Sequence, residues 1–130
     1  RQLLRTDPRD AYAHAGLLAL RGQGIDPVTT ESRLKTLLAG EPDSAVLNFS
    51  LGNQYAQQAR WAEAQQVYFK AVAAEPENPD YAYNLAVSLE HLRKAGPALD
   101  YYRRALALAQ GRNASFDRAA AQARVQQLAR

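Results

Sequence analysis

His14 and His91 are the side chains best suited to acid–base or metal chemistry in this chain of 130 residues. Neither histidine has a partner at helical spacing, in a His-x-x-x-His or Glu-x-x-His pattern, of the kind that holds zinc on a helix. The chain has no cysteine, which excludes thiolate nucleophiles, thiolate metal sites and disulfides. We therefore interpret both histidines as structural residues and expect no metal ion and no other cofactor.

The remaining short motifs fit helix boundaries better than they fit an active site. Gly22-Gln23-Gly24 is too short for a phosphate-binding loop and follows no predicted strand. Asp7-Pro8 and Asp26-Pro27 are helix-boundary signals. Asp26-Pro27 is typical of a helix start, because aspartate caps free N–H groups and proline is tolerated in the first turn. The sequence offers no converging nucleophile, base and orienting group, and so predicts a protein that is not an enzyme.

The composition favours a folded domain without a membrane span. Hydrophobic residues make up 47% of the chain and charged residues 22%, which is enough apolar surface for a core. The net charge is +3, and the arginines are spread along the chain, so we expect solvated helix faces and no nucleic-acid partner. No apolar run approaches the roughly 18 residues that a membrane span requires. Because the chain starts at Arg1 without a methionine, we expect a fragment of a longer protein.

Three prolines reveal an internal repeat. The interval from Pro8 to Pro42 equals the interval from Pro42 to Pro76, and an acidic residue precedes each proline. A repeat of about 34 residues is typical of stacked helical units. Other columns keep the same spacing: Leu17, Leu51 and Leu85; Leu34, Tyr68 and Tyr102; Gly52 and Ala86; Ala64 and Ala98.

Apolar residues at three- and four-residue spacing predict two helices in each repeat. The predicted helices cover residues 45–57, 61–74, 79–92 and 97–109, and a further helix covers 115–130. The acidic-Pro pairs should end helices, because proline continues a helix poorly. Gly52 and Ala86 should let helices approach closely, while Tyr68 and Tyr102 fill the space between them. The sequence therefore predicts an all-α fold.

The repeat resembles the tetratricopeptide repeat family. Leu51-Gly52-Asn53-Gln54-Tyr55 resembles the signature of the first helix, Trp61-Ala62-Glu63-Ala64 and Tyr68-Phe69-Lys70-Ala71 that of the second, and Pro76 the closing proline. The resemblance implies a right-handed superhelix of antiparallel hairpins. It divides the chain into the end of a preceding repeat helix (1–10), a divergent first repeat (11–44), two further repeats (45–78 and 79–112) and a C-terminal capping helix (113–130).

The resemblance also implies where a partner would bind. In this family the first helices of the hairpins line a concave face, and we expect Phe49 and Tyr83 to be its exposed apolar anchors. Asn53 should bind a peptide backbone beside Phe49. The full set of expected partner-binding residues is Tyr12, Val46, Phe49, Asn53, Tyr83, Asn84, Val87 and Glu90.

One class of partner is not expected. Family members that bind acidic chaperone tails use a clamp of lysine, arginine and asparagine. Its basic positions correspond here to Ala15, Asp80 and Asn84, so the clamp is missing. An acidic chaperone C-terminal tail is therefore not the expected ligand.

The leading hypothesis is a non-catalytic scaffold that binds a protein or peptide on its concave face. The resemblance extends loosely to repeat modules of bacterial envelope machines, such as type IV pilus or secretion assemblies. The first alternative is a regulatory or oligomerisation domain of a larger enzyme, and a homo-oligomer is compatible with both hypotheses. A third hypothesis is a basic module that binds lipid or nucleic acid. The sequence does not distinguish bacterial cytoplasm from periplasm, nor the soluble part of a membrane-associated protein.

Overall fold

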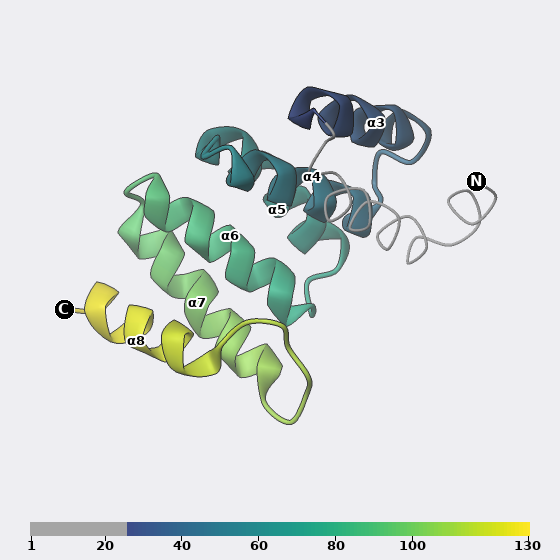
Figure 1. Ribbon diagram of the computed structural model, residues 1–130. Coiled ribbons are helices and arrows are strands. Elements are labelled where there is room, and N and C mark those ends of the chain that lie inside the picture. The colour runs from purple at the N-terminus through teal and green to yellow at the C-terminus, as the bar shows by residue number, and fades with distance from the viewer. Residues whose placement is uncertain (1–25) are drawn as a thin grey trace.

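The computed structural model describes residues 26–130 as a stack of helices (Figure 1). Every regular element in that range is a helix, as the sequence predicts. Tyr12, His14 and the expected helices before residue 26 lie outside the described residues. No described helix is both long enough and apolar enough to cross a membrane. The helices are α3 (Pro27–Gly40), α4 (Ala45–Gln57), α5 (Trp61–Ala74), α6 (Pro79–His91), α7 (Ala95–Ala109) and α8 (Arg118–Leu128).

Two antiparallel hairpins form the centre of the stack. Helix α4 packs on α5, and α6 packs on α7. Three further contacts connect these hairpins to each other and to the end helices: α3 packs on α4, α5 on α6, and α7 on α8. Helix α8 therefore continues the stack where the first helix of another hairpin would lie (Figure 1).

The chain reverses direction in two different ways. The hairpin turns, residues 58–60 and 92–94, each contain a residue with positive φ: 58° at Ala59 and 64° at Arg93. The next residue in each turn, Arg60 or Lys94, donates its N–H to the carbonyl of a residue five positions earlier. The connecting loops, residues 41–44, 75–78 and 110–117, join successive hairpins. Because the helices are antiparallel, the two kinds of turn lie at opposite edges of the stack.

Side-chain caps mark the helix starts after the connecting loops. Ser44 accepts a hydrogen bond from the Leu47 N–H, and Asn78 accepts from the N–H groups of the first turn of α6. Asp117 caps α8 in the same way. Helix α8 thus begins at Arg118 and not at Ser115, because Asp117 supplies the cap. Helix α7 begins at Ala95, two residues before the predicted start at Pro97.

The core follows the repeat columns. Tyr68 and Tyr102 are each 2% exposed, and Ala64, Ala86 and Ala98 are fully buried. A Cβ atom added at Gly52 would lie 2.5 Å from the Tyr68 ring. This geometry confirms the prediction that a minimal side chain at position 52 lets the two helices approach.

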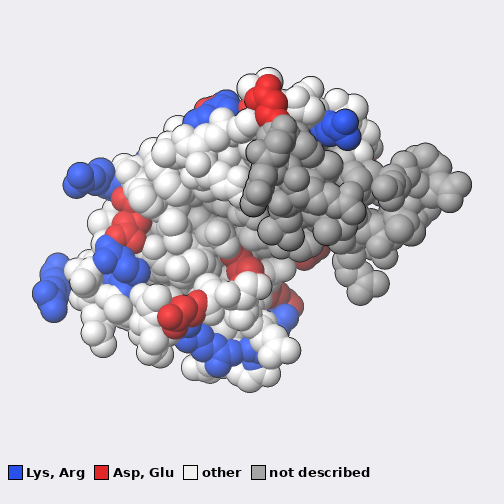
Figure 2. Space-filling view, viewed as in Figure 1, with Lys and Arg blue, Asp and Glu red and all other residues white. Residues whose placement is uncertain are grey.

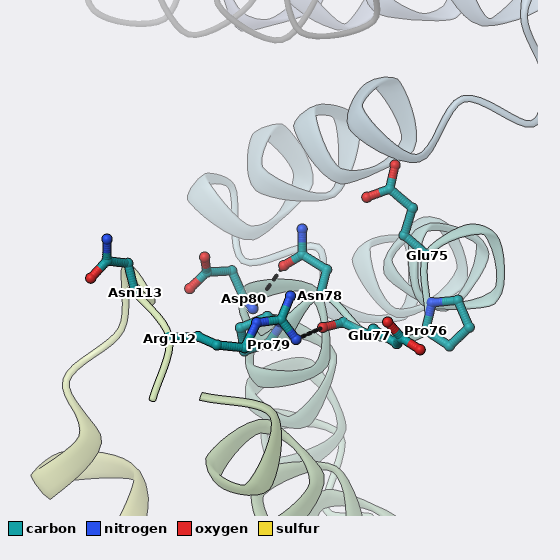
Figure 3. Close-up of a pocket in the computed structure, with 8 residues that line it drawn as sticks. All are labelled: Glu75, Pro76, Glu77, Asn78, Pro79, Asp80, Arg112 and Asn113. Carbon is teal, nitrogen blue, oxygen red and sulfur yellow. Dashed lines mark hydrogen bonds between the residues drawn. The ribbon is translucent and has the colours of Figure 1, made fainter. Parts of the chain in front are cut away.

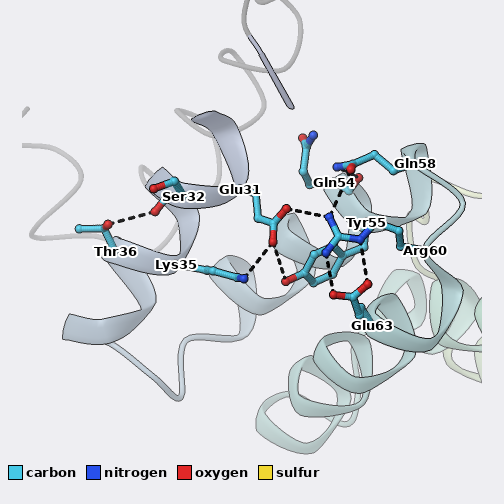
Figure 4. A network of polar contacts seen from close by, with 9 residues as sticks. All are labelled: Glu31, Ser32, Lys35, Thr36, Gln54, Tyr55, Gln58, Arg60 and Glu63. Carbon is cyan, nitrogen blue, oxygen red and sulfur yellow. Dashed lines mark hydrogen bonds and ion pairs between the residues drawn. The ribbon is translucent and has the colours of Figure 1, made fainter. Parts of the chain in front are cut away.

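A polar network links α3 to the next hairpin (Figure 4). Arg60 donates to Glu31 at 2.8 Å, and forms an ion pair with Glu63 at 2.6 Å. Lys35 pairs with Glu31 at 2.9 Å, and the Arg60 guanidinium lies over the Tyr55 ring, 4.6 Å from its centroid. The hydrogen bond from Arg60 lowers the pKa of Glu31 to about 2, with help from Lys35. We call the Arg60–Glu31 contact the clasp.

The clasp recurs one repeat later in neutral form. Lys94 occupies the repeat position of Arg60 and donates to Gln65 at 3.1 Å, while Gln65 occupies the repeat position of Glu31. Both contacts join residues separated by 29 positions. A polar contact at the same position therefore links each unit to the next. Both partners are charged in the Arg60–Glu31 contact, whereas Gln65 is neutral in the Lys94–Gln65 contact.

Candidate binding groove

Phe49 is not an exposed anchor. Its side chain is only 7% exposed, and its ring lies 5.7 Å from the Tyr68 ring and 4.7 Å from the Tyr81 ring, measured between centroids. The expectation of an exposed ring is wrong because α6 of the following hairpin packs over this position. A partner cannot contact the face of this ring unless the core opens.

Tyr83 occupies the equivalent position in the next hairpin and is half-buried. Its ring lies 5.7 Å from Tyr102 in an edge-on arrangement, and stacks on Phe116 with centroids 4.5 Å apart and planes 4° apart. The segment before α8 therefore takes the place on Tyr83 that α6 takes on Phe49. Tyr83 keeps some exposed surface, but it is not a free anchor.

A groove remains between α6 and α8. It has a volume of about 520 Å³ and brings together three of the predicted residues, Tyr83, Val87 and Glu90. Its complete lining is Tyr83, Val87, Glu90, His91, Arg93, Tyr102, Ala120 and Arg124. We refer to this cavity as the α6–α8 groove.

The other predicted site residues do not line this groove. Asn53 accepts a hydrogen bond from the Tyr68 hydroxyl at 2.6 Å, and the Asn84 amide donates to the Asp80 carbonyl at 2.8 Å. Both side chains therefore already have partners within the fold. Val46 is half-buried on the first turn of α4.

The floor of the groove is a satisfied charge network. The Glu90 carboxylate accepts from the Tyr102 hydroxyl at 2.8 Å and from Arg124 Nε at 3.1 Å, and it also forms an ion pair with Arg124. Burial raises the pKa of Tyr102, so its hydroxyl stays protonated and remains a donor. Glu90 is therefore not free to bind a partner's cation.

The rim of the groove carries exposed cationic and aromatic groups. His91 and Arg93 are exposed, and the His91 ring stacks on Trp61 at 3.8 Å between centroids, with the planes 4° apart. The groove thus offers the edges of Tyr83 and Val87 beside a guanidinium and an imidazole. Such a surface suits an apolar side chain that adjoins a carboxylate or a backbone carbonyl.

Sequence reasoning missed the roles of Tyr102 and Arg124 in the groove. It places Tyr102 in the core, and Arg124 on the polar face of the capping helix. The sequence did contain one indication of the Glu90–Arg124 contact: the two residues are 34 positions apart, one repeat length, and have opposite charges. The described residues contain no cluster of histidine and carboxylate side chains that could hold a metal ion.

A second hollow lies at the α5–α6 loop (Figure 3). Its volume is about 460 Å³, and its lining is Glu75, Pro76, Glu77, Asn78, Pro79, Asp80, Arg112 and Asn113. Arg112 donates to the Glu77 carbonyl at 3.3 Å, and the Ser115 N–H donates to the Asp80 carboxylate at 2.7 Å. These contacts attach the α7–α8 loop to the preceding loop, so the hollow is part of the stacking of the units.

Comparisons with known proteins agree with this architecture. No family model and no curated protein sequence matches the chain. Among solved structures, MamA AMB-1 is 23% identical with a TM-score of 0.73, over 94% of this chain and 62% of that chain. YrrB, titled a TPR protein with an unusual peptide-binding site, is 23% identical with a TM-score of 0.77, over 94% of this chain and 58% of that chain.

A third similar structure contains a bound peptide. It is titled the first TPR of Spaghetti (RPAP3) bound to the HSP90 peptide SRMEEVD, and is 16% identical with a TM-score of 0.76, over 94% of this chain and 90% of that chain. The chain thus spans less than two thirds of MamA and of YrrB. These likenesses show that the chain has the tetratricopeptide repeat fold, an α–α superhelix.

Proposed function

We propose that this protein is a non-catalytic scaffold that binds a protein or peptide partner in the α6–α8 groove on its concave face. The observation that carries the proposal is the juxtaposition of half-buried Tyr83 and Val87 with exposed Arg93 along one cavity of about 520 Å³. An extended segment could place an apolar side chain against Val87 and an acidic or carbonyl group against Arg93. Two proteins of the same fold are described by their titles as peptide binders, which supports this class of function.

The proposed partner is not an acidic chaperone tail. The clamp that such tails need has Asp80 and Asn84 at two of its basic positions, and the Asn84 amide is bonded to the Asp80 carbonyl. A peptide ending in MEEVD would place its carboxylates near Asp80. The proposed setting in a bacterial envelope assembly rests on the resemblance of the sequence alone.

The test is selection of peptides from a random display library, followed by titration of the selected peptide against Val87→Glu. The introduced carboxylate would sit in the groove beside Glu90 and should weaken binding by roughly 1–3 kcal/mol. Arg103→Glu is the matched control, because Arg103 is exposed on α7 and does not line the groove. Equal affinity of the wild type and Val87→Glu, with both proteins folded, would refute the proposed site.

A second arm of the same experiment uses the peptide SRMEEVD. We expect no saturable binding of this peptide by the wild-type chain. Tight binding of SRMEEVD would contradict the prediction that acidic chaperone tails do not bind. If that binding also survived Val87→Glu, it would contradict the α6–α8 groove as the binding site.

A further inference from the structure

Charge is divided unevenly along the described chain. Residues 26–90 contain nine acidic and four basic side chains, whereas residues 91–130 contain eight basic and two acidic side chains. A net charge of +3 for the whole chain hides this separation. The stack therefore has an acidic part and a basic part, each with a charge large enough to orient an approaching charged surface.

The acidic part meets solvent at the connecting loops. Two acidic-Pro-acidic turns, Glu41-Pro42-Asp43 and Glu75-Pro76-Glu77, occupy the same position of successive repeats and lie at the same edge of the stack. Asp43, Glu75 and Glu77 are exposed, and none forms an ion pair with another described residue. We call this surface the acidic edge; Figure 3 shows its second turn, beside which Arg112 is the one cation among the described residues that line the hollow.

Three of the eight basic side chains of residues 91–130 meet solvent at the opposite edge. Arg93 and Lys94 are exposed in the α6–α7 turn, and Arg130 is exposed after α8. Among the described residues, Lys94 donates to the neutral Gln65 and forms no ion pair. By contrast, Arg60, in the preceding turn, is neutralised by Glu31 and Glu63. In Figure 2, several Lys and Arg side chains lie at the left of the view with Asp or Glu side chains between them, where Figure 1 places the α6–α7 turn and the C-terminus. We call the surface of Arg93, Lys94 and Arg130 the basic edge.

We propose that the basic edge docks on the acidic edge of a second copy of this chain. The two edges lie on opposite sides of one molecule, so each copy presents both halves of the contact. Such a heterologous contact does not close on itself and would join copies into chains. A polyanion such as RNA, or an anionic membrane, would match only residues 91–130 and would be repelled by the acidic edge. A second copy satisfies the charges of both edges, and this favours it as the partner.

The contact is electrostatic and its strength should depend on salt. Exposed charges interact over about 10 Å at 0.1 M ionic strength and over less at higher salt. Sedimentation velocity of the full chain should show association at about 20 mM salt that weakens at least about tenfold at about 500 mM. The proposal is independent of the α6–α8 groove, and the variants below leave Arg93 unchanged because it lines that groove.

Two double variants test the edges separately. Lys94→Glu with Arg130→Glu removes positive charge from the basic edge, and Glu75→Lys with Glu77→Lys reverses the second turn of the acidic edge. Each variant alone should sediment as a monomer. An equal mixture of the two should associate again, because the native acidic edge of one variant meets the native basic edge of the other. All four side chains are exposed, so both variants should keep the wild-type circular dichroism spectrum.

The matched control is Arg103→Glu with Arg104→Glu, which changes the charge by the same amount on the exposed side of α7. It should associate like the wild type. A wild type that stays monomeric at about 20 mM salt would overturn the proposal, as would association that neither edge variant reduces. A monomeric wild type that binds a short RNA duplex or phosphatidylserine vesicles through Lys94 and Arg130 would assign the basic edge to that polyanion instead.

Discussion

Gly52 shows how one residue sets the distance between two helices. Tyr68 lies directly over it, and the Tyr68 hydroxyl is held by Asn53 at 2.6 Å, which fixes the position of the ring. The next repeat has Ala86 in this column, and there the Tyr102 hydroxyl bonds to Glu90 instead, because position 87 is a valine without an acceptor. The two buried tyrosines therefore have different hydrogen-bond acceptors: Asn53 for Tyr68, and Glu90 for Tyr102.

We predict that Gly52→Ala destabilises the protein, although alanine is the better helix former. The added Cβ would lie 2.5 Å from a buried ring, so the free energy of unfolding should fall by roughly 1–3 kcal/mol. Gly96→Ala is the control, because its added Cβ would meet no atom of another helix or side chain within 4 Å. The helical preference of alanine should stabilise α7 by up to about 1 kcal/mol. Urea denaturation measures both; equal stability of Gly52→Ala and wild type would contradict the close approach.

Among the described helices, α8 has the fewest buried residues. Ala121 is its only fully buried residue, with Val125 and Leu128 half-buried beside it. Its attachment relies on contacts near its start and middle, namely Phe116 stacked on Tyr83 and Arg124 paired with Glu90. Helices this short are marginal without packing and caps, so α8 should open before the central hairpins.

We expect Asp117→Ala to loosen α8 selectively. The Asp117 carboxylate accepts from the N–H groups of Ala119 and Ala120, and the loss of such a cap costs about 1 kcal/mol. Hydrogen exchange should therefore quicken in α8 while α4 and α5 keep their protection. Asp117→Asn is the control, because asparagine caps nearly as well. Unchanged exchange in α8 would mean that packing alone fixes this helix.

At the scale of the whole molecule, the stack is a series of interfaces between neighbours. Each unit contacts only the next, so stability is the sum of unit and interface contributions. The clasp at Arg60–Glu31 and its neutral counterpart at Lys94–Gln65 reinforce two successive interfaces. The first interface should therefore depend on pH and the second should not.

Glu31→Gln tests that dependence. The Glu31 side chain is 12% exposed, and its pKa is lowered from 4.5 to about 2, mainly by the Arg60 hydrogen bond. A lowered folded-state pKa contributes stability that is complete above the unfolded value and is lost as the pH falls from about 4.5 towards 2. At pH 7 the variant should be less stable than wild type by about 1 kcal/mol.

The stability difference between wild type and Glu31→Gln should shrink as the pH falls through that window. Urea denaturation at pH 7 and at about pH 3 measures it. The reverse substitution, Gln65→Glu, should create an ion pair with Lys94 and stabilise the second interface at neutral pH. A constant difference between Glu31→Gln and wild type at both pH values would show that the clasp contributes nothing through charge.

The sequence by itself determined the length of the repeat and the presence of the helices. It also determined which repeat positions hold small core residues and which hold bulky ones. It could do so because these features depend on local rules: proline ends helices, apolar residues follow a spacing of three and four, and Gly52 must match a bulky partner. Those predictions needed only the register of the repeat, which the prolines mark. Helix α8 starts three residues later than predicted because Asp117 caps it. Helix α7 starts two residues earlier than predicted, without a side-chain cap at its first turn.

Only the tertiary structure decided which predicted groove residues are open. Phe49 and Tyr83 share a column, yet Phe49 is buried beneath α6 while Tyr83 is partly covered by Phe116. Burial at these positions depends on how the next unit packs, and no pattern within a single repeat records that packing. The pairing of Glu90 with Arg124 and the separation of charge onto two edges have the same cause: residues distant in sequence become neighbours only when the hairpins stack.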